Sequence, residues 1–249
     1  MDLADQELDL AAGFAAKASA ELDHMLGLVH WLMLLLFVIW APFFIYTLIR
    51  FRAKKNPVAN YKGVQSRMSS YLEVGIVVAE VVLLFGFAFP QWAMLKHDFP
   101  PEADATVVHV ISEQFAWNIH YPGPDGLFGR RDVNLVNLSS NPVGLDPNDP
   151  NGQDDITTVN ELHLPVDRPV IVHLSSKDVI HSFGLPVMRV KQDAIPGLTI
   201  PIWFEPTQTG EWEIACAQLC GLSHYRMRGY LTVHSGADFD AWLQEQAGE

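Results

Sequence analysis

The most informative stretch of the sequence is residues 216–227, which read CAQLCGLSHYRM. This stretch contains Cys216, Cys220, His224 and Met227, in the spacing Cys-x3-Cys-x3-His-x2-Met. Thiolate and imidazole donors suit copper, and a thioether beside thiolates is seldom recruited for zinc. The spacing therefore predicts a metal centre near the C-terminal end of the chain, with copper as the favoured metal.

A second imidazole for the same centre is His181, in the upstream segment His-Ser-Phe-Gly-Leu-Pro. A thiolate can bridge two metal ions, so two cysteines, two histidines and Met227 are enough to hold a pair of copper ions. The main-chain carbonyl of Gln218, which lies between the cysteines, adds a further weak donor. Sharing one electron over two coppers limits the rearrangement on reduction, so the pattern predicts an electron-transfer site and not a substrate pocket.

Two other interpretations of the cysteine pair stay open at this stage. In an extracytoplasmic domain the two thiols could form a disulfide, or they could be half of a zinc site. A disulfide would leave the histidine and methionine spacing as a coincidence. Zinc would leave Met227 unexplained, so a dinuclear copper site is the favoured interpretation.

Two apolar segments near the N-terminus, residues 25–49 and 74–95, predict a membrane anchor. Apolar residues make up 49% of the chain and concentrate there, and Glu80 is the one charged residue of the second segment. Each segment can cross a hydrocarbon core of about 30 Å, which takes about 20 helical residues. We therefore expect a two-helix hairpin over residues 25–96, preceded by an extracytoplasmic segment over residues 1–24.

The connection between the two apolar segments predicts their orientation. From Arg50 to Leu72 it contains no acidic residue, and its basic residues are Arg50, Arg52, Lys54, Lys55, Lys62 and Arg67. Such positively charged connections stay in the cytoplasm. Both ends of the chain and the metal centre are therefore expected on the outer, periplasmic side of a bacterial inner membrane.

The net charge of −13 is concentrated in the outer part of the chain. From Lys96 to the end there are 21 acidic and 9 basic residues, a net charge of −12. An acidic domain would steer a basic electron carrier by long-range attraction, with a strong dependence on salt. A merely solvated acidic surface is the alternative, and we expect no nucleic-acid partner.

Residues 97–235 contain short segments with the alternation and flanking turns typical of strands, at 107–111, 114–121, 170–175, 198–204, 211–216 and 229–234. Such strands predict an all-β sandwich or Greek-key barrel. A turn-rich insertion over residues 121–155 interrupts them, and its aspartates are interpreted as turn formers in preference to calcium ligands. A short amphipathic helix is expected over residues 236–249.

These features together resemble subunit II of the haem–copper cytochrome c oxidases. The resemblance rests on the 216–227 motif, on His181-Ser182-Phe183 and on Asp193-Ala194-Ile195-Pro196-Gly197, and it extends from about Met25 to Ser235. It implies a membrane-anchored cupredoxin domain with a binuclear copper centre, called CuA. The implied ligands are His181 and Met227 on one copper, His224 and the Gln218 carbonyl on the other, and Cys216 and Cys220 on both.

The resemblance also implies a redox partner on each side of the copper centre. A cytochrome c-like donor, soluble or held in a respiratory supercomplex, would deliver single electrons. A haem in subunit I would receive them for the reduction of oxygen to water with proton pumping. The family's Gln-Trp-x-Trp run, through which electrons enter, reads Gln114-Phe115-Ala116-Trp117 here, so Phe115 stands at the position of the first tryptophan and Trp117 at the second.

Two other positions bear on what the resemblance implies. Glu73 is similar to a glutamate at the mouth of the family's proton path, although Gly75 and Ile76 depart from that pattern. The family has a glutamate where this chain has Gln218, and that side chain also ligates a magnesium ion shared with subunit I. A neutral amide is a weaker partner for a hard dication, so the magnesium site is not carried over.

Three other functions remain open on the sequence alone. A quinol oxidase subunit would have lost the copper donors, which are all present here. A membrane-anchored copper-delivery protein would keep its site open, whereas this donor set closes around both metals. A nitric-oxide-reducing relative can use the same copper module, because the choice of substrate lies in the catalytic subunit. With both cysteines assigned to copper, no Cys-x-x-Cys-His site for a covalent haem remains.

Overall fold

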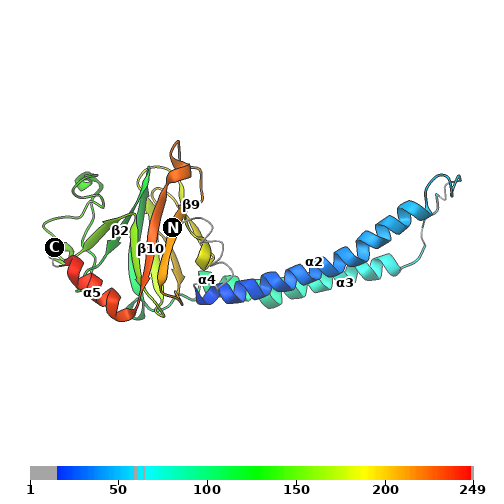
Figure 1. The fold of residues 1–249 in the computed structure, drawn as a ribbon, viewed down its shortest axis with the longest axis horizontal. Coiled ribbons are helices and arrows are strands. Elements are labelled where there is room, and N and C mark those ends of the chain that lie inside the picture. Colours follow the sequence, from blue (N-terminus) through cyan, green and yellow to red (C-terminus); the bar gives the residue numbers. More distant parts are fainter. Residues whose placement is uncertain (1–15, 59–60, 64, 248–249) are drawn as a thin grey trace. The chain divides into compact units, whose positions relative to one another are not determined.

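The computed structural model describes residues 16–58, 61–63 and 65–247, and for residues 17–21 it describes the main chain alone (Figure 1). Most of the predicted N-terminal segment, residues 1–24, therefore lies outside the described residues. The chain divides into two compact units, one spanning Glu21–Met94 and one that contains Leu95–Glu249. The two units are described separately below.

The first unit consists of two long apolar helical stretches. Helix α2 spans Lys17–Arg50, and a second stretch is formed by α3 (Met68–Leu83), the π-helical turn η1 (Leu84–Ala88) and α4 (Phe89–Lys96). The parts Leu22–Arg50 and Met68–Lys96 are each 29 residues long and apolar enough to cross a membrane, and none of their most apolar residues is buried within the protein. Exposed apolar surface of this extent is stable in lipid or against a partner, and not in water. The predicted pair of apolar helices is confirmed.

Within the described residues, the second unit contains two five-stranded sheets. The first sheet has the order β3-β2-β1-β5-β8, with β1 (Thr106–Glu113), β2 (Ala116–Tyr121), β3 (Ile156–Val159), β5 (Val170–Ser176) and β8 (Ile200–Phe204). The second has the order β4-β10-β9-β6-β7, with β4 (Glu161–Pro165), β6 (His181–Leu185), β7 (Val190–Ala194), β9 (Gly210–Cys216) and β10 (Arg228–His234). This all-β architecture confirms the predicted fold class.

The core of this unit lies between the inward faces of the strands. In β1, Val108 and Val110 are buried in the core cluster, while His109 between them points to the other face of the sheet. In β10, Leu231 and Val233 follow the same alternation. The β-branched and aliphatic residues that gave the alternating sequence pattern are therefore the ones that fill the core.

Four strands were not predicted: β3, β4, β6 and β7. β6 is buried at all five positions, so its sequence shows no alternation of apolar and polar residues. β7 reads Val-Lys-Gln-Asp-Ala and is an edge strand, which tolerates polar side chains. β3 and β4 are short and separated by Asn160, whose positive φ of 62° makes the turn between them.

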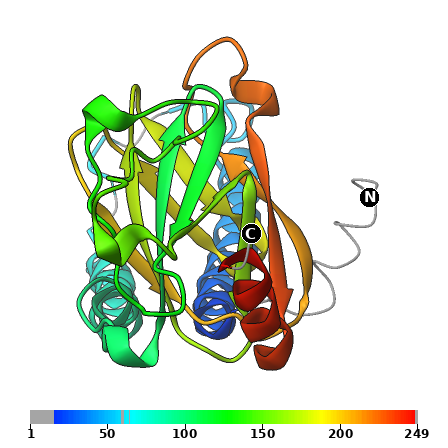
Figure 2. The same ribbon diagram turned by 90° about the vertical axis from the view of Figure 1, so that its left-hand side faces the viewer.

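The insertion between β2 and β3 covers the outward face of the first sheet (Figure 2). Its Phe128 ring stacks on His109 of β1 at 4.1 Å. Its Asp155 carboxylate accepts a hydrogen bond of 2.6 Å from Nε2 of His120 in β2, and both side chains are 0% exposed. Both contacts attach the insertion to the sheet.

The carboxylates of the insertion are used in its own turns. Main-chain N–H groups donate to Asp132 from Asn134 (2.8 Å), to Asp149 from Arg130 (2.8 Å), to Asp154 from Asp125 (3.1 Å) and to Asp155 from Gly129 (2.9 Å). The Arg130 guanidinium also pairs with Asp146 and Asp149. These contacts agree with the interpretation of the aspartates as turn formers.

The C-terminal helix α5 (Gly236–Ala247) packs on the second sheet through aromatic rings. Phe239 is buried, and Trp242 stacks on His163 of β4 at 4.3 Å. His163 Nδ1 and His234 Nε2 are hydrogen-bonded at 2.8 Å. These histidines thus have structural partners in the helix and the sheet.

Candidate metal centre

The predicted ligands come from the second sheet and the connection that follows it. His181 is the first residue of β6, and Cys216 is the last residue of β9. These strands pair antiparallel with Phe183 opposite Cys216, so both ligands lie at the same end of the sheet. Cys220 lies in the connection from β9 to β10, which a hydrogen bond from Cys216 N to Met227 O (3.3 Å) closes into a loop.

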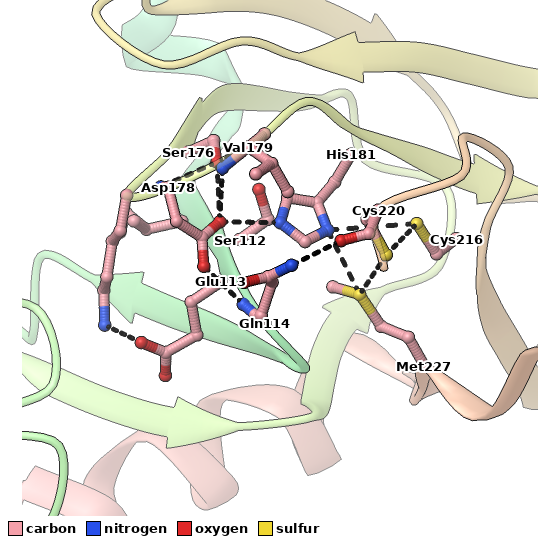
Figure 3. A network of polar contacts seen from close by, with 12 residues as sticks. Ser112, Glu113, Gln114, Ser176, Asp178, Val179, His181, Cys216, Cys220 and Met227 are labelled. Carbon is pink, nitrogen blue, oxygen red and sulfur yellow. Dashed lines mark hydrogen bonds and ion pairs between the residues drawn. The ribbon is translucent and has the colours of Figure 1, made fainter. Parts of the chain in front are cut away.

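The sulfur and imidazole donors converge at this end of the sheet (Figure 3). The Sγ atoms of Cys216 and Cys220 lie 3.7 Å apart. His181 Nδ1 lies 3.9 Å from Cys216 Sγ and 3.2 Å from Met227 Sδ. His224 Nδ1 lies 3.7 Å from Cys220 Sγ. The fold therefore brings together side chains that are up to 46 residues apart in the sequence.

The remaining predicted donor is the carbonyl oxygen of Gln218, 3.2 Å from Cys216 Sγ, while the Gln218 side chain is exposed. In the described part of the chain, His181, Cys216 and Cys220 are the one group of three or more His, Cys, Asp or Glu ligand atoms within 4.8 Å of one another. The thiols are free, and their separation is far above the disulfide length of about 2.05 Å. The donor set fits a soft metal ion.

The two thiols differ in their tendency to ionise. Burial opposes ionisation of Cys216, but hydrogen bonds from the His181 imidazole and from nearby groups lower the pKa of this thiol to about 6. Burial and the adjacent Cys216 sulfur raise the pKa of Cys220 to about 11. One thiolate therefore forms readily and the second needs a cation, because a bound metal deprotonates a coordinating thiol outright.

Asp178 orients the His181 ring. Nε2 of His181 donates to Asp178 Oδ1 at 2.9 Å, which fixes the ring with Nδ1 directed at the sulfur atoms. Burial raises the pKa of Asp178, but the hydrogen bonds from His181 and from the main-chain N–H groups of Gln114 and Val179 together outweigh it, and the net shift is downward. Asp178 was not among the predicted site residues, although the spacing Asp-x-x-His before a ligand histidine is a usable signal.

Gln114 braces the loop that carries the cysteines (Figure 3). Its Nε2 donates to Cys220 O at 2.6 Å, and its main-chain N–H donates to Asp178 Oδ2 at 2.7 Å. Gly221 passes so close that a Cβ there would lie 2.7 Å from Gln114 Nε2 and 3.0 Å from the Phe115 ring, and its φ is +140°. The β1–β2 turn and the cysteine loop are therefore in close contact.

The residues predicted for electron and proton transfer lie in different surroundings. Trp117 is fully buried, with its ring 6.2 Å from the His181 ring, and Phe115 is half-buried against Gly221. Glu73 is an exposed residue of α3, in the other unit. Their roles stay predictions.

Comparison with known proteins identifies the family to which this chain belongs. The sequence model of the cytochrome c oxidase subunit II periplasmic domain matches residues 106–233, which include all six predicted copper donors. The chain belongs to the cytochrome c oxidase subunit II family.

Named relatives agree with this assignment to the subunit II family. An alternative cytochrome c oxidase subunit 2 from Bradyrhizobium diazoefficiens is 35% identical over 227 residues, covering 90% of this chain and 80% of the relative. Cytochrome c oxidase subunit 2 of Cereibacter sphaeroides is 30% identical over 236 residues, covering 88% of this chain and 76% of that protein. The crystal structure of the periplasmic domain of subunit II from Bradyrhizobium japonicum is 27% identical, covers 57% of this chain and 94% of that one, and has a TM-score of 0.43.

Family membership settles the broad class of the protein. The chain is a membrane-anchored subunit of an oxidoreductase complex of the cytochrome c oxidase family. Its partners are other subunits of that complex. The His181, Cys216 and Cys220 cluster is its candidate metal site.

Proposed function

We propose that this chain is the CuA subunit of a cytochrome c oxidase. It takes single electrons from a cytochrome c-like donor on the outer face of the membrane and passes them to a haem in subunit I, where oxygen is reduced to water with proton pumping. The observation that carries the proposal is the convergence of thiol, imidazole and thioether donors at distances of 3.2 to 3.9 Å. Membership of the subunit II family supports it.

The chain holds the donor atoms in position and shields the sulfur atoms of Cys220 and Met227 from water. The residues that would hold two copper ions are His181, Cys216, Gln218 through its carbonyl, Cys220, His224 and Met227. Bound there, the copper pair would take up and release one electron at a time. Cys220 and Met227 are buried, so little water has to reorganise around the sulfur atoms when charge changes. Asp178 and Gln114 fix the ligand ring and the loop, which limits the movement of the donors.

The charge pattern supports the proposed sidedness. The basic residues of the connection between α2 and α3 favour the cytoplasm, so both termini and the metal centre would lie on the outer, periplasmic side of a bacterial inner membrane. The donor would then approach from outside, either as a soluble protein or as part of a supercomplex. The exposed Gln218 amide offers a hard dication one carbonyl oxygen, so we do not propose a magnesium site.

Glu73 is proposed to lie at the start of a proton path. It is near the cytoplasmic end of the second apolar stretch, where a carboxylate costs free energy unless it meets water or a partner. We expect Glu73→Gln to slow proton uptake during oxygen reduction and to leave the copper spectrum unchanged. Unaltered turnover in that variant would remove Glu73 from the proposal.

The alternative functions are less well supported. The relatives matched over most of the chain bear the name cytochrome c oxidase subunit 2, which favours oxygen over nitric oxide as the final electron acceptor. A copper-delivery protein would need an open site, whereas Cys220 and Met227 are almost inaccessible. A quinol oxidase subunit would lack the donors.

Electron paramagnetic resonance of the oxidised full chain, purified with its accompanying subunits, tests the proposal. We expect about two copper ions per chain by metal analysis, and hyperfine splitting from one unpaired electron shared over two copper nuclei. A single-copper spectrum, or zinc in place of copper, would refute the proposed centre.

A further inference from the structure

A hollow of about 740 Å³ lies between the first sheet and the insertion that covers its outward face. β1 contributes Ile111 to one wall and β5 contributes Ser175, which stands opposite Ile111 in the register of the two strands. Residues 131–143 of the insertion form the other wall. None of the predicted copper donors lines this hollow. Its volume lies in the range of small-molecule sites, which is about 300–1,000 Å³.

Aliphatic side chains form much of the lining of the hollow. Ile111 and Val143 are 7% and 6% exposed, although neither belongs to the core cluster between the sheets. Val136 is half-buried and Val133 is 82% exposed, so the lining remains open to water on the side of the insertion. An apolar chain placed in the hollow would remove this aliphatic surface from water. The hollow therefore favours a ligand with an apolar chain.

One lining residue, Arg131, supplies an unpaired positive charge. In the described part of the chain its guanidinium makes no ion pair and no hydrogen bond, whereas that of Arg130 pairs with Asp146 and Asp149. The charge of Asp155 acts on Arg131, but the Asp155 carboxylate is 0% exposed and is hydrogen-bonded to His120 and to the main chain of Gly129. Arginine presents several N–H donors in the geometry that matches a carboxylate. Arg131 is therefore available to bind an anion.

The other polar groups of the hollow restrict how much negative charge it can take. Lys177 Nζ pairs with Glu113 Oε2 at 2.9 Å and is already neutralised. Asp132 is exposed, and its Oδ1 accepts a hydrogen bond of 2.8 Å from the main-chain N–H of Asn134. Because one cation is unpaired and one carboxylate lies nearby, a phosphate or a dicarboxylate would be repelled more than a single carboxylate.

The polar wall of the hollow is ordered in advance. The Ser176 hydroxyl donates to Val179 O and accepts a hydrogen bond of 3.3 Å from Asp178 N (Figure 3). Lys177 N donates to Ser112 O at 3.0 Å. The Ser175 hydroxyl makes no hydrogen bond within the described residues, so it can donate to a ligand. A wall that is already ordered loses little conformational entropy when it binds.

We propose that this hollow binds a small aliphatic monocarboxylate. The carboxylate accepts hydrogen bonds from the Arg131 guanidinium and the Ser175 hydroxyl, and the aliphatic chain lies against Ile111, Val133 and Val136. The site does not depend on the metal centre, so it goes beyond the proposed electron transfer and stands or falls separately from it.

Saturation-transfer NMR on the full chain, purified with its accompanying subunits, tests the proposal with hexanoate as the probe. We expect hexanoate to bind with a Kd of about 1 mM. Hexanol has the same chain without the charge and should bind about tenfold more weakly. Butanoate lacks two methylene groups of hexanoate and should bind about tenfold more weakly as well.

Three variants locate the site. Arg131→Gln should weaken hexanoate binding about tenfold, because it removes a charged hydrogen-bond donor. Arg168→Gln is the matched control, since Arg168 is an exposed arginine in the connection between β4 and β5 and does not line the hollow. It should leave Kd within about twofold. Asp132→Asn should tighten binding about threefold, because it removes a repelling charge and keeps an acceptor for Asn134.

The remaining outcomes would overturn the proposal. Equal Kd values for Arg131→Gln and Arg168→Gln would show that hexanoate binds elsewhere, for example in lipid or detergent, whose uptake is the same in all variants. Hexanol binding as tightly as hexanoate, or weaker hexanoate binding in Asp132→Asn, would show that the hollow does not recognise a carboxylate. Copper-depleted complex should bind hexanoate with an unchanged Kd, so a missing two-copper signal would count against the proposed function alone.

Discussion

Two irregular segments of the outer unit are rich in possible metal ligands and use them in opposite ways. In the loop of residues 216–227, the sulfur and imidazole donors point at one another at 3.7 Å or less. In the insertion of residues 122–155, the carboxylates accept hydrogen bonds from the main chain of the same segment or from His120. The first segment leaves its donors available to a metal, and the second consumes them in its own structure.

This difference separates a binding site from a structural turn better than composition does. Both segments have the right residue types for a metal, soft in one case and hard in the other. What distinguishes them is whether the lone pairs are already accepting N–H donors. A carboxylate that accepts hydrogen bonds from the main chain of a turn is already stabilised by them. A cation could bind that carboxylate only if these hydrogen bonds broke.

The largest effect expected from this comparison follows from Cys220→Ser in the metal loop. Losing a thiolate that bridges both metals should abolish the two-copper signal and reduce oxidase turnover to background. Its fold should survive, because Cys220 forms no disulfide and serine is of similar size. Metal analysis and electron paramagnetic resonance measure the loss, and circular dichroism checks the fold. A retained two-nucleus hyperfine pattern would contradict the assignment of Cys220.

The opposite result is expected for Asp155→Ala in the insertion. The change leaves buried N–H groups of His120 and Gly129 unpaired, so the free energy of unfolding should fall by about 3 kcal/mol. The two-copper signal should stay unchanged. Asp125→Ala, at an exposed carboxylate of the same segment, should cost less than about 1 kcal/mol. Urea unfolding of the three proteins gives the comparison, and equal losses for both variants would refute the structural role of Asp155.

The sequence predicts the metal loop well because its ligands are close together in the chain. Cys216, Cys220, His224 and Met227 fall within one turn-rich segment, so their spacing alone restricts the chemistry. His181 is harder to place, since it lies on β6, a strand buried at all positions that shows no alternation. Asp178 is harder still, because its role depends on the direction of one imidazole ring.

The sequence predicts the insertion as a segment, but it does not predict that the insertion is attached to the first sheet. Its anchorage depends on the sheet register, which puts His109 opposite both His120 and His173 in a row of three histidines across neighbouring strands. Register is set by side chains on both faces and by turns far apart in the chain. A single sequence does not carry that information in a local pattern, so these histidines read as unrelated.

A change of pH should affect the insertion through the middle histidine of that row. Burial, then Arg131 and the neighbouring His120 and His173 lower the pKa of His109 from 6.5 to about 3. Since folding favours the neutral form, the contribution to stability is full above pH 6.5 and falls as the pH decreases towards 3. At pH 5 the loss is about 2 kcal/mol.

The pH dependence is measured as the difference in free energy of unfolding between pH 8 and pH 5. His109→Gln, which cannot be protonated in this range, should make that difference smaller by about 2 kcal/mol. Protease cleavage within the insertion should rise at pH 5 in the unaltered chain. An equal pH dependence in both proteins would show that His109 does not sense protons in the folded state.

The smallest effect is expected from Asp178→Asn, which tests whether the metal loop depends on support outside itself. An amide can still accept the hydrogen bond from His181 Nε2, but it lacks the charge that makes the ring a better donor to metal. Copper affinity should fall about tenfold, in line with the loss of carboxylates that orient metal-ligating histidines. Glu213→Gln is the control, because Glu213 lies near the centre and pairs with Arg228 instead of a ligand. Competition with a copper chelator measures both affinities. If the two variants bind copper equally well, the centre holds its metal without support from Asp178 in the connection between β5 and β6, and the contrast with the insertion becomes sharper still.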